Sequence, residues 1–210
     1  MASGHAQGTV VFNNQLPGTL VTHVYLAGQF SGPVAGNGPD DTPSGTTNYR
    51  DAEGPLEGSG WSAQIWAAAG ANQAESSLQP ASPITSFLMG TQAGFFVPVI
   101  ASLAGVPVDA PVATLAVRVW DNRGGTITSW RMAYGFALTG ESPLFNVFNI
   151  GGGINEPPPL TGLQSFSISD IPEPSTLAFA VLGSAVLTAL TSIGRQKNVS
   201  KTDQLAAPPD

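Results

Sequence analysis

The stretch Val112–Trp120, VATLAVRVW, is the clearest β-strand in the chain. Its side chains alternate with a period of two, which is typical of a strand whose two faces meet different surroundings. The two sets are Leu115, Val117 and Val119 on one face and Ala116, Arg118 and Trp120 on the other. We therefore expect a half-buried strand at the centre of a sheet.

The residues on either side of this strand supply its expected partners. Asp121–Gly125 (DNRGG) is typical of a turn, because Asn and Gly tolerate positive φ. It predicts a hairpin in which 126–133 returns as a strand. Trp61–Ala69 (WSAQIWAAA) is a second alternating run, with Trp61 and Ile65 on one face and Trp66 on the other.

The rest of the body repeats this pattern of short apolar runs and Gly/Pro/Asn/Asp turns. Residues 28–59 form a long polar loop and 150–160 a shorter one, and 71–78 suits a helical turn. The other strand candidates are Gly8–Asn13, Leu20–Leu26, Ile84–Met89, Phe95–Ile100 and Leu163–Ser169. Eight or nine short strands without a long helix predict a mainly β body, an antiparallel β-sandwich of jelly-roll type over 8–169.

Composition excludes several classes of function. Charged residues make up 10 % of the chain, net charge is −7, and residues 8–171 contain four arginines and no lysine. Such a body has no basic patch for nucleic acid. The chain has no cysteine, which excludes disulfides, thiolate metal sites and a cysteine nucleophile.

The C-terminal end has three parts in a fixed order. A Pro-rich linker, 170–176, precedes the uncharged run Leu177–Ile193, and the tail 194–210 follows. Seventeen uncharged residues, four of them Ser or Thr, span about 25 Å, near the lower limit for a transmembrane helix. Arg195, Lys197 and Lys201 then place the tail in the cytoplasm by the positive-inside rule. The alternative is a buried or amphipathic core helix.

This order of Pro172-Glu173-Pro174-Ser175, apolar helix and basic residues resembles the PEP-CTERM sorting signal of bacteria. The resemblance implies that an exosortase, a membrane-embedded protease-transpeptidase, acts near Pro172–Pro174. It also implies that the chain is held in the cell membrane before processing and reaches the cell surface or extracellular matrix afterwards. Such systems accompany exopolysaccharide and biofilm formation.

Three phrases of the body resemble PEP-CTERM proteins of Verrucomicrobia-like bacteria, which have no assigned activity. They are Gly8–Asn14, Gly60–Gln64 and Val117–Asn122.

An exported chain needs an export signal. We expect residues 1–7 to be the remnant of a signal-peptide cleavage region, since Gly4 and Ala6 are small residues at the spacing that a signal peptidase requires. The alternative is an ordinary N-terminal extension.

Residue types that carry catalysis are scarce. The two histidines are His5, near the N-terminus, and His23, in a strand-like run, so neither a Ser-His-Asp triad nor a histidine zinc site is expected. Asp40 and Asp41 are weak candidates for calcium. We therefore predict no enzymatic activity and no cofactor.

Two hypotheses follow. The first is a non-enzymatic surface or matrix protein associated with polysaccharide, in which aromatic side chains stack on sugars. The candidates for stacking are Trp61, Trp66, Trp120 and Trp130. The alternative is that at least two of these tryptophans are core residues. The second is a secreted glycan hydrolase that uses two loop carboxylates. Its candidates are Asp40, Asp41, Asp51, Glu53, Glu57, Glu75, Asp121 and Glu141.

Overall fold

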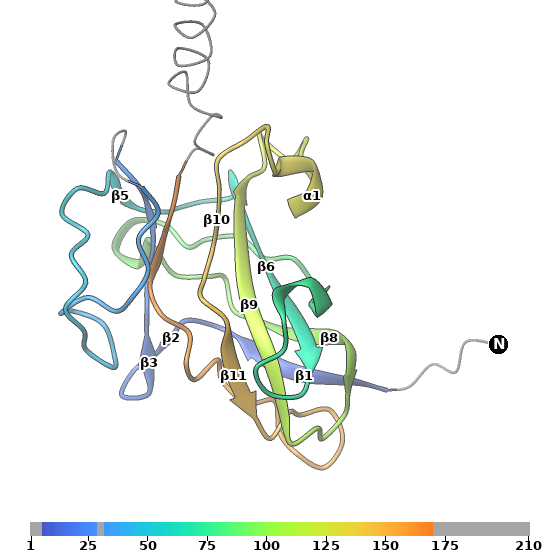
Figure 1. Cartoon of the computed structure of the whole chain (residues 1–210). Coiled ribbons are helices and arrows are strands. Elements are labelled where there is room, and N and C mark those ends of the chain that lie inside the picture. Colours follow the sequence, from blue (N-terminus) through green and yellow to red (C-terminus); the bar gives the residue numbers. More distant parts are fainter. Residues whose placement is uncertain (1–5, 29–31, 170–210) are drawn as a thin grey trace, which may run out of the picture. The chain divides into compact units, whose positions relative to one another are not determined.

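The computed structural model describes residues 6–28 and 32–169, which form a mainly β body (Figure 1). Within these ranges no helix is long and apolar enough to cross a membrane. The predictions for the linker 170–176, the membrane span 177–193 and the tail 194–210 lie outside the described residues. The same holds for residues 1–5 of the expected signal remnant.

The largest sheet is built around β9 (Val112–Asp121), the strand predicted most clearly from sequence. β6 (Trp61–Ala69) pairs with it antiparallel along its whole length, from Trp61 opposite Asp121 to Ala69 opposite Ala113. The other edge of β9 is shared by two strands. β10 (Thr139–Glu141) pairs with its second half and β11 (Phe145–Phe148) with its first half. β7 (Gln79–Pro80) completes the sheet beside β6.

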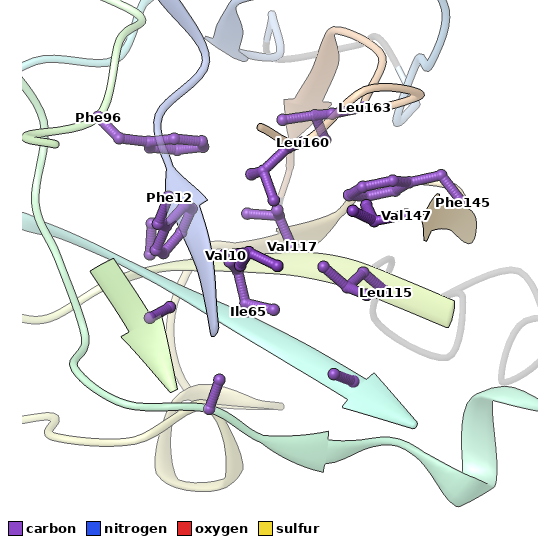
Figure 2. Packing of buried hydrophobic residues seen from close by; sticks show 14 of the residues in the cluster. Val10, Phe12, Ile65, Phe96, Leu115, Val117, Phe145, Val147, Leu160 and Leu163 are labelled. Carbon is purple, nitrogen blue, oxygen red and sulfur yellow. The ribbon is translucent and has the colours of Figure 1, made fainter. Parts of the chain in front are cut away.

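A second layer crosses one face of this sheet. β1 (Gln7–Phe12) pairs antiparallel with β8 (Val99–Pro107). Figure 2 shows Val10 and Phe12 of β1 pointing toward Ile65 of β6 and Val117 of β9. These side chains are fully buried, so the main core lies between the β1–β8 ribbon and the sheet.

Two small sheets close one side of this core. β4 (Val24–Leu26) lies between β12 (Phe166–Ile168) and β5 (Gly54–Pro55), and β2 (Gln15–Leu16) pairs with β3 (Leu20–Val21). β12 runs parallel to β4, whereas the expected body was wholly antiparallel. Phe166 and Ile168 bury their side chains in the main core, which holds the last strand in this position.

The predicted hairpin partner at 126–133 is wrong. The turn is present, with Arg123, Gly124 and Gly125 at positive φ. The chain then forms a short helix, α1 (Trp130–Ala133), and β10 pairs with β9 instead. Trp130 and Ala133 are buried and lie one helical turn apart, so burial of this pair favours helix over strand.

Two turns of 3-10 helix complete the described elements. The helical turn expected within 71–78 is confirmed as η1 (Glu75–Ser77), and η2 (Gly90–Gln92) follows later.

Asn14 joins three backbone segments inside the body. Its amide nitrogen donates to the carbonyl oxygens of Thr22 (2.6 Å) and Gly94 (3.0 Å). Its amide oxygen accepts a hydrogen bond from the backbone N–H of Phe96 at 2.8 Å. The side chain is fully buried, so it supplies partners to backbone groups that water does not reach.

Candidate functional site

The second face of β9 carries an arginine inside an aromatic cluster. Alternation sends Arg118 away from the main core, to the side where Trp66, Leu78 and Trp130 are buried. The Arg118 side chain is only 9 % exposed, although it is charged. A charge at this depth needs partners, and the surrounding residues provide them.

Two indole rings contact the guanidinium group. Its central carbon lies 4.2 Å from the centroid of the Trp66 ring and 5.4 Å from that of Trp130. Trp66 comes from β6, where it pairs with Ala116, and Trp130 is the first residue of α1. Both distances are within the range of cation–π attraction.

Two carboxylates hold the same group from other directions. The Nη2 atom of Arg118 donates to Glu75 Oε1 at 2.6 Å, and its Nε atom donates to Glu141 Oε2 at 3.0 Å. Glu75 belongs to η1, and Glu141 is the last residue of β10, directly opposite Arg118 in register. The two glutamate side chains are 56 % and 42 % exposed, so they face solvent as well as the arginine.

These groups line an open pocket with a volume of about 580 Å³. Tyr134, 62 % exposed, and Arg131 lie at its edge. The full lining is Trp66, Glu75, Ser76, Leu78, Gln79, Arg118, Trp130, Arg131, Tyr134 and Glu141. Two cations and two carboxylates balance in formal charge, so the pocket offers apolar rings, donors and acceptors without a net charge. We refer to it as the Arg118 pocket.

Only two of the four predicted tryptophans lie in this pocket. Trp120 is fully buried and donates its indole N–H to the carbonyl of Ile127 at 3.1 Å, so it cannot stack on a sugar. Trp61 is partly buried against the main core, on the opposite face of β6 from Trp66. Trp120 and Trp61 are therefore packed against the cores, which agrees with the alternative, and Trp66 and Trp130 remain as candidates for stacking.

The role of Arg118 was not predicted from the sequence. One signal was available: Arg118 shares its face of the strand with Ala116 and Trp120, and the paired strand presents Trp66. The positions of Glu75, Tyr134 and Glu141 depend on η1, α1 and β10, whose packing no local pattern predicts.

Asp41, the calcium candidate, is committed to other contacts. Its Oδ1 lies 2.8 Å from Nδ1 of His23, and its Oδ2 accepts hydrogen bonds from Ser165 Oγ (2.8 Å) and the backbone N–H of Gly38 (2.6 Å). Burial acts to raise the pKa of Asp41, but these hydrogen bonds outweigh it and hold the pKa below its ordinary value.

These contacts do not suit either chemistry considered for the residue. Both carboxylate oxygens are engaged and Asp40 beside it is exposed, which argues against calcium. In residues 6–28 and 32–169 no three His, Cys, Asp or Glu side chains gather as a metal site. Ser165 and His23 both contact Asp41, whereas a catalytic triad places the histidine in the middle. The cluster is a buried link between the polar loop and the end of the body.

A tyrosine pair lies beside this link. The rings of Tyr25 and Tyr49 stack with centroids 4.2 Å apart. Burial, followed by the charge of Asp41, raises the pKa of Tyr25 to about 12 and also raises that of Tyr49. Both stay neutral at physiological pH and fasten the loop to β4.

The remaining acids are scattered. Glu57 accepts a hydrogen bond from the backbone of Gly90, and Asp121 pairs with Arg123 at 3.1 Å. Only Glu75 and Glu141, of the eight hydrolase candidates, meet at one group.

No family model, curated protein or solved structure matches this chain. The likeness to PEP-CTERM proteins therefore stays a prediction from the residues quoted above.

Proposed function

We propose that this protein binds neutral glycans at the bacterial cell surface, and that its C-terminal segment is the sorting signal that delivers it there. The observation that carries the binding proposal is the position of Arg118. Its guanidinium lies against Trp66 and Trp130 and is held by two carboxylates in one open pocket.

This arrangement has the chemistry that a sugar needs. A pyranose has an apolar C–H face, which packs on aromatic rings, and a rim of hydroxyls, which need acceptors and donors. The exposed ring of Tyr134 supplies such a face, and Glu75, Glu141 and Arg131 surround it with polar groups. The volume of about 580 Å³ lies within the usual range for small-molecule sites. Formal neutrality of the pocket favours an uncharged sugar.

Binding fits the pocket better than glycoside cleavage. A hydrolase needs two carboxylates on either side of the scissile bond, with free space between them for the sugar. Here Arg118 occupies the space between Glu75 and Glu141 and donates a hydrogen bond to one carboxylate oxygen of each. A glycosidic oxygen has no place between the two acids while that arginine is present, so we propose no enzymatic activity.

Delivery rests on the C-terminal sequence. We propose that Pro172–Ser175 is read by an exosortase, that Leu177–Ile193 crosses the membrane, and that Arg195, Lys197 and Lys201 hold the tail inside until processing. Exopolysaccharide is then the natural ligand at the place of release. For the body we infer a β-sandwich, supported by the β1–β8 ribbon packed across the β6–β9 sheet; the jelly-roll form stays a prediction.

Binding is tested by titrating the full chain, in a detergent without a sugar headgroup, with neutral and acidic polysaccharides. Two tryptophans line the pocket, so the proposal expects a saturable change in Trp fluorescence with a neutral glycan. Tyr134→Ala should weaken binding by about 1 kcal/mol, or roughly fivefold in Kd. Phe148→Ala is the matched control, because that ring is similarly exposed on β11, outside the pocket. A titration without any response, or equal loss in both variants, rejects the binding proposal.

A further inference from the structure

The chain leaves the body beside β10. Ser169, the last residue described, forms a two-way backbone bridge with Thr139, with N–O distances of 3.3 and 3.2 Å. Thr139 in turn pairs with Trp120, near the end of β9. The exit point is therefore at the Trp120 end of the large sheet.

The same end carries exposed apolar side chains. Three residues before β10, Phe136 is 82 % exposed, and Met132 and Tyr134 are 51 % and 62 % exposed. Figure 1 shows α1 at the end of the body where the orange chain of β12 finishes. We call residues 130–136 the aromatic edge.

Buried residues and backbone hydrogen bonds anchor the aromatic edge to the body. Trp130 and Ala133 are buried in the cluster around Arg118. The backbone N–H of Tyr134 donates to Trp130, and that of Phe136 to Ala133, both at 2.9 Å. The backbone that carries the exposed rings is thus tied to the buried cluster, although exposure of large apolar groups is unfavourable in water.

Cations accompany these rings. Arg131 is exposed within α1, and Arg123 donates from Nη2 to the carbonyl oxygen of Phe136 at 3.4 Å while pairing with Asp121. Aromatic rings with arginines are the composition that anionic membrane interfaces attract.

A short tether joins this end to the proposed membrane span. Seven residues, 170–176, separate Ser169 from Leu177. Even fully extended they reach roughly 25–30 Å. If 177–193 crosses the membrane as proposed above, this length sets an upper limit on the distance between Ser169 and the bilayer.

We propose that the aromatic edge docks into the interface of the outer leaflet while the chain is anchored, which orients the body before processing. The proposal rests on the membrane span of the proposed function. Its occupant is an anionic lipid surface, because the exposed cation beside the rings is Arg131, whereas Arg123 is paired with Asp121.

The absence of cysteine makes the test direct, since a single introduced cysteine can be labelled. The full chain is reconstituted into phosphatidylethanolamine–phosphatidylglycerol vesicles as Phe136→Cys, Phe148→Cys or Ala185→Cys, each carrying an environment-sensitive fluorophore. Lipids spin-labelled near the headgroup or deep in the acyl chain serve as quenchers. Phe148 is the matched control, since it pairs with Val112 at the opposite end of β9.

The proposal expects a blue shift and shallow-label quenching at position 136, neither at 148, and deep-label quenching at 185. Quenching at 185 with none at 136 overturns the docking and leaves the membrane span intact. Equal quenching at 136 and 148 also overturns it, because the contact is then not confined to this end. An unquenched probe at 185 overturns both the span and the docking that depends on it.

Discussion

The guanidinium of Arg118 lies 4.2 Å from the ring centroid of Trp66, on the face of β9 that points away from the main core. This contact gives a buried charge an aromatic partner in addition to its two glutamates. It also places the guanidinium against an indole that lines the Arg118 pocket. If the pocket binds glycan as proposed, stability and binding are linked at this arginine.

Arg118→Lys tests that link. Lysine keeps the charge, but it has no planar fork to reach Glu75 and Glu141 together and stacks less well on Trp66. We expect the free energy of unfolding to fall by about 1–2 kcal/mol, and glycan affinity to fall with it. Urea unfolding measures the first effect. Arg131→Lys, at an exposed position of the same pocket, should leave stability unchanged; equal effects of the two changes would contradict the assigned role.

Asn14→Leu should be strongly destabilising. Leucine is similar in size but removes the buried side-chain partner of the Thr22 carbonyl and the Phe96 N–H, and one of the two donors to the Gly94 carbonyl. We expect a loss of about 3–5 kcal/mol in the free energy of unfolding. Asn13→Ala is the control, since the Asn13 side chain bonds to nearby Gln15, and the loss in the free energy of unfolding should stay below about 1 kcal/mol. Chemical denaturation of both variants measures the two losses. A much larger loss for Asn14→Leu supports a buried network at Asn14, and equal losses would contradict it.

Asp41→Asn should remove a pH-dependent part of the stability. The pKa of Asp41 is lowered in the folded state, so its contribution is present above the ordinary pKa of aspartate and is lost as pH falls through the folded value. At pH 7 we expect the variant to be about 2 kcal/mol less stable than the natural chain. This difference in the free energy of unfolding between the variant and the natural chain should narrow below about pH 4.

Denaturation midpoints at pH 7 and pH 3 measure this gap. Asp40→Asn, at the exposed neighbour, should show no gap at either pH. A difference that is independent of pH would assign the effect of Asp41→Asn to packing rather than to its charge.

Replacing both Pro172 and Glu173 with Ala tests delivery. Cells making this variant should accumulate the uncleaved, membrane-bound chain, because the proposed exosortase no longer recognises its motif. Mass spectrometry of the mature C-terminus reports the processing site. Pro208→Ala and Pro209→Ala, in the tail, are the controls. Equal processing of the motif variant and the natural chain would refute the sorting proposal.

Local patterns predicted the centre of the body well. Period-two alternation located β9 and β6 and assigned their two faces correctly, because each strand separates two buried clusters. The expectation of a half-buried β9 understated its burial, since Arg118 and Trp120 on the second face are also buried.

Pairing between segments distant in sequence was harder to predict from local patterns. The run Phe95–Ile100 predicted a strand that begins later and continues as β8 to Pro107, whereas Ile84–Met89 forms only isolated bridges. Leu20–Leu26 is interrupted at Thr22 and His23, whose backbone N–H groups bond to Asn14 and Ser165 instead of to a strand. The Arg118 pocket likewise joins residues more than forty positions apart, and no local periodicity encodes such contacts.

The glycan site is tested most directly by nuclear magnetic resonance of the four tryptophan side chains. Each indole N–H gives one signal, which single Trp→Phe variants assign in the full chain labelled with ¹⁵N-tryptophan. On addition of a neutral glycan, the signals of Trp66 and Trp130 should shift in a saturable manner, and those of Trp61 and Trp120 should stay in place. A shift of Trp61 alone, or no shift with any glycan, would contradict a binding site at Arg118.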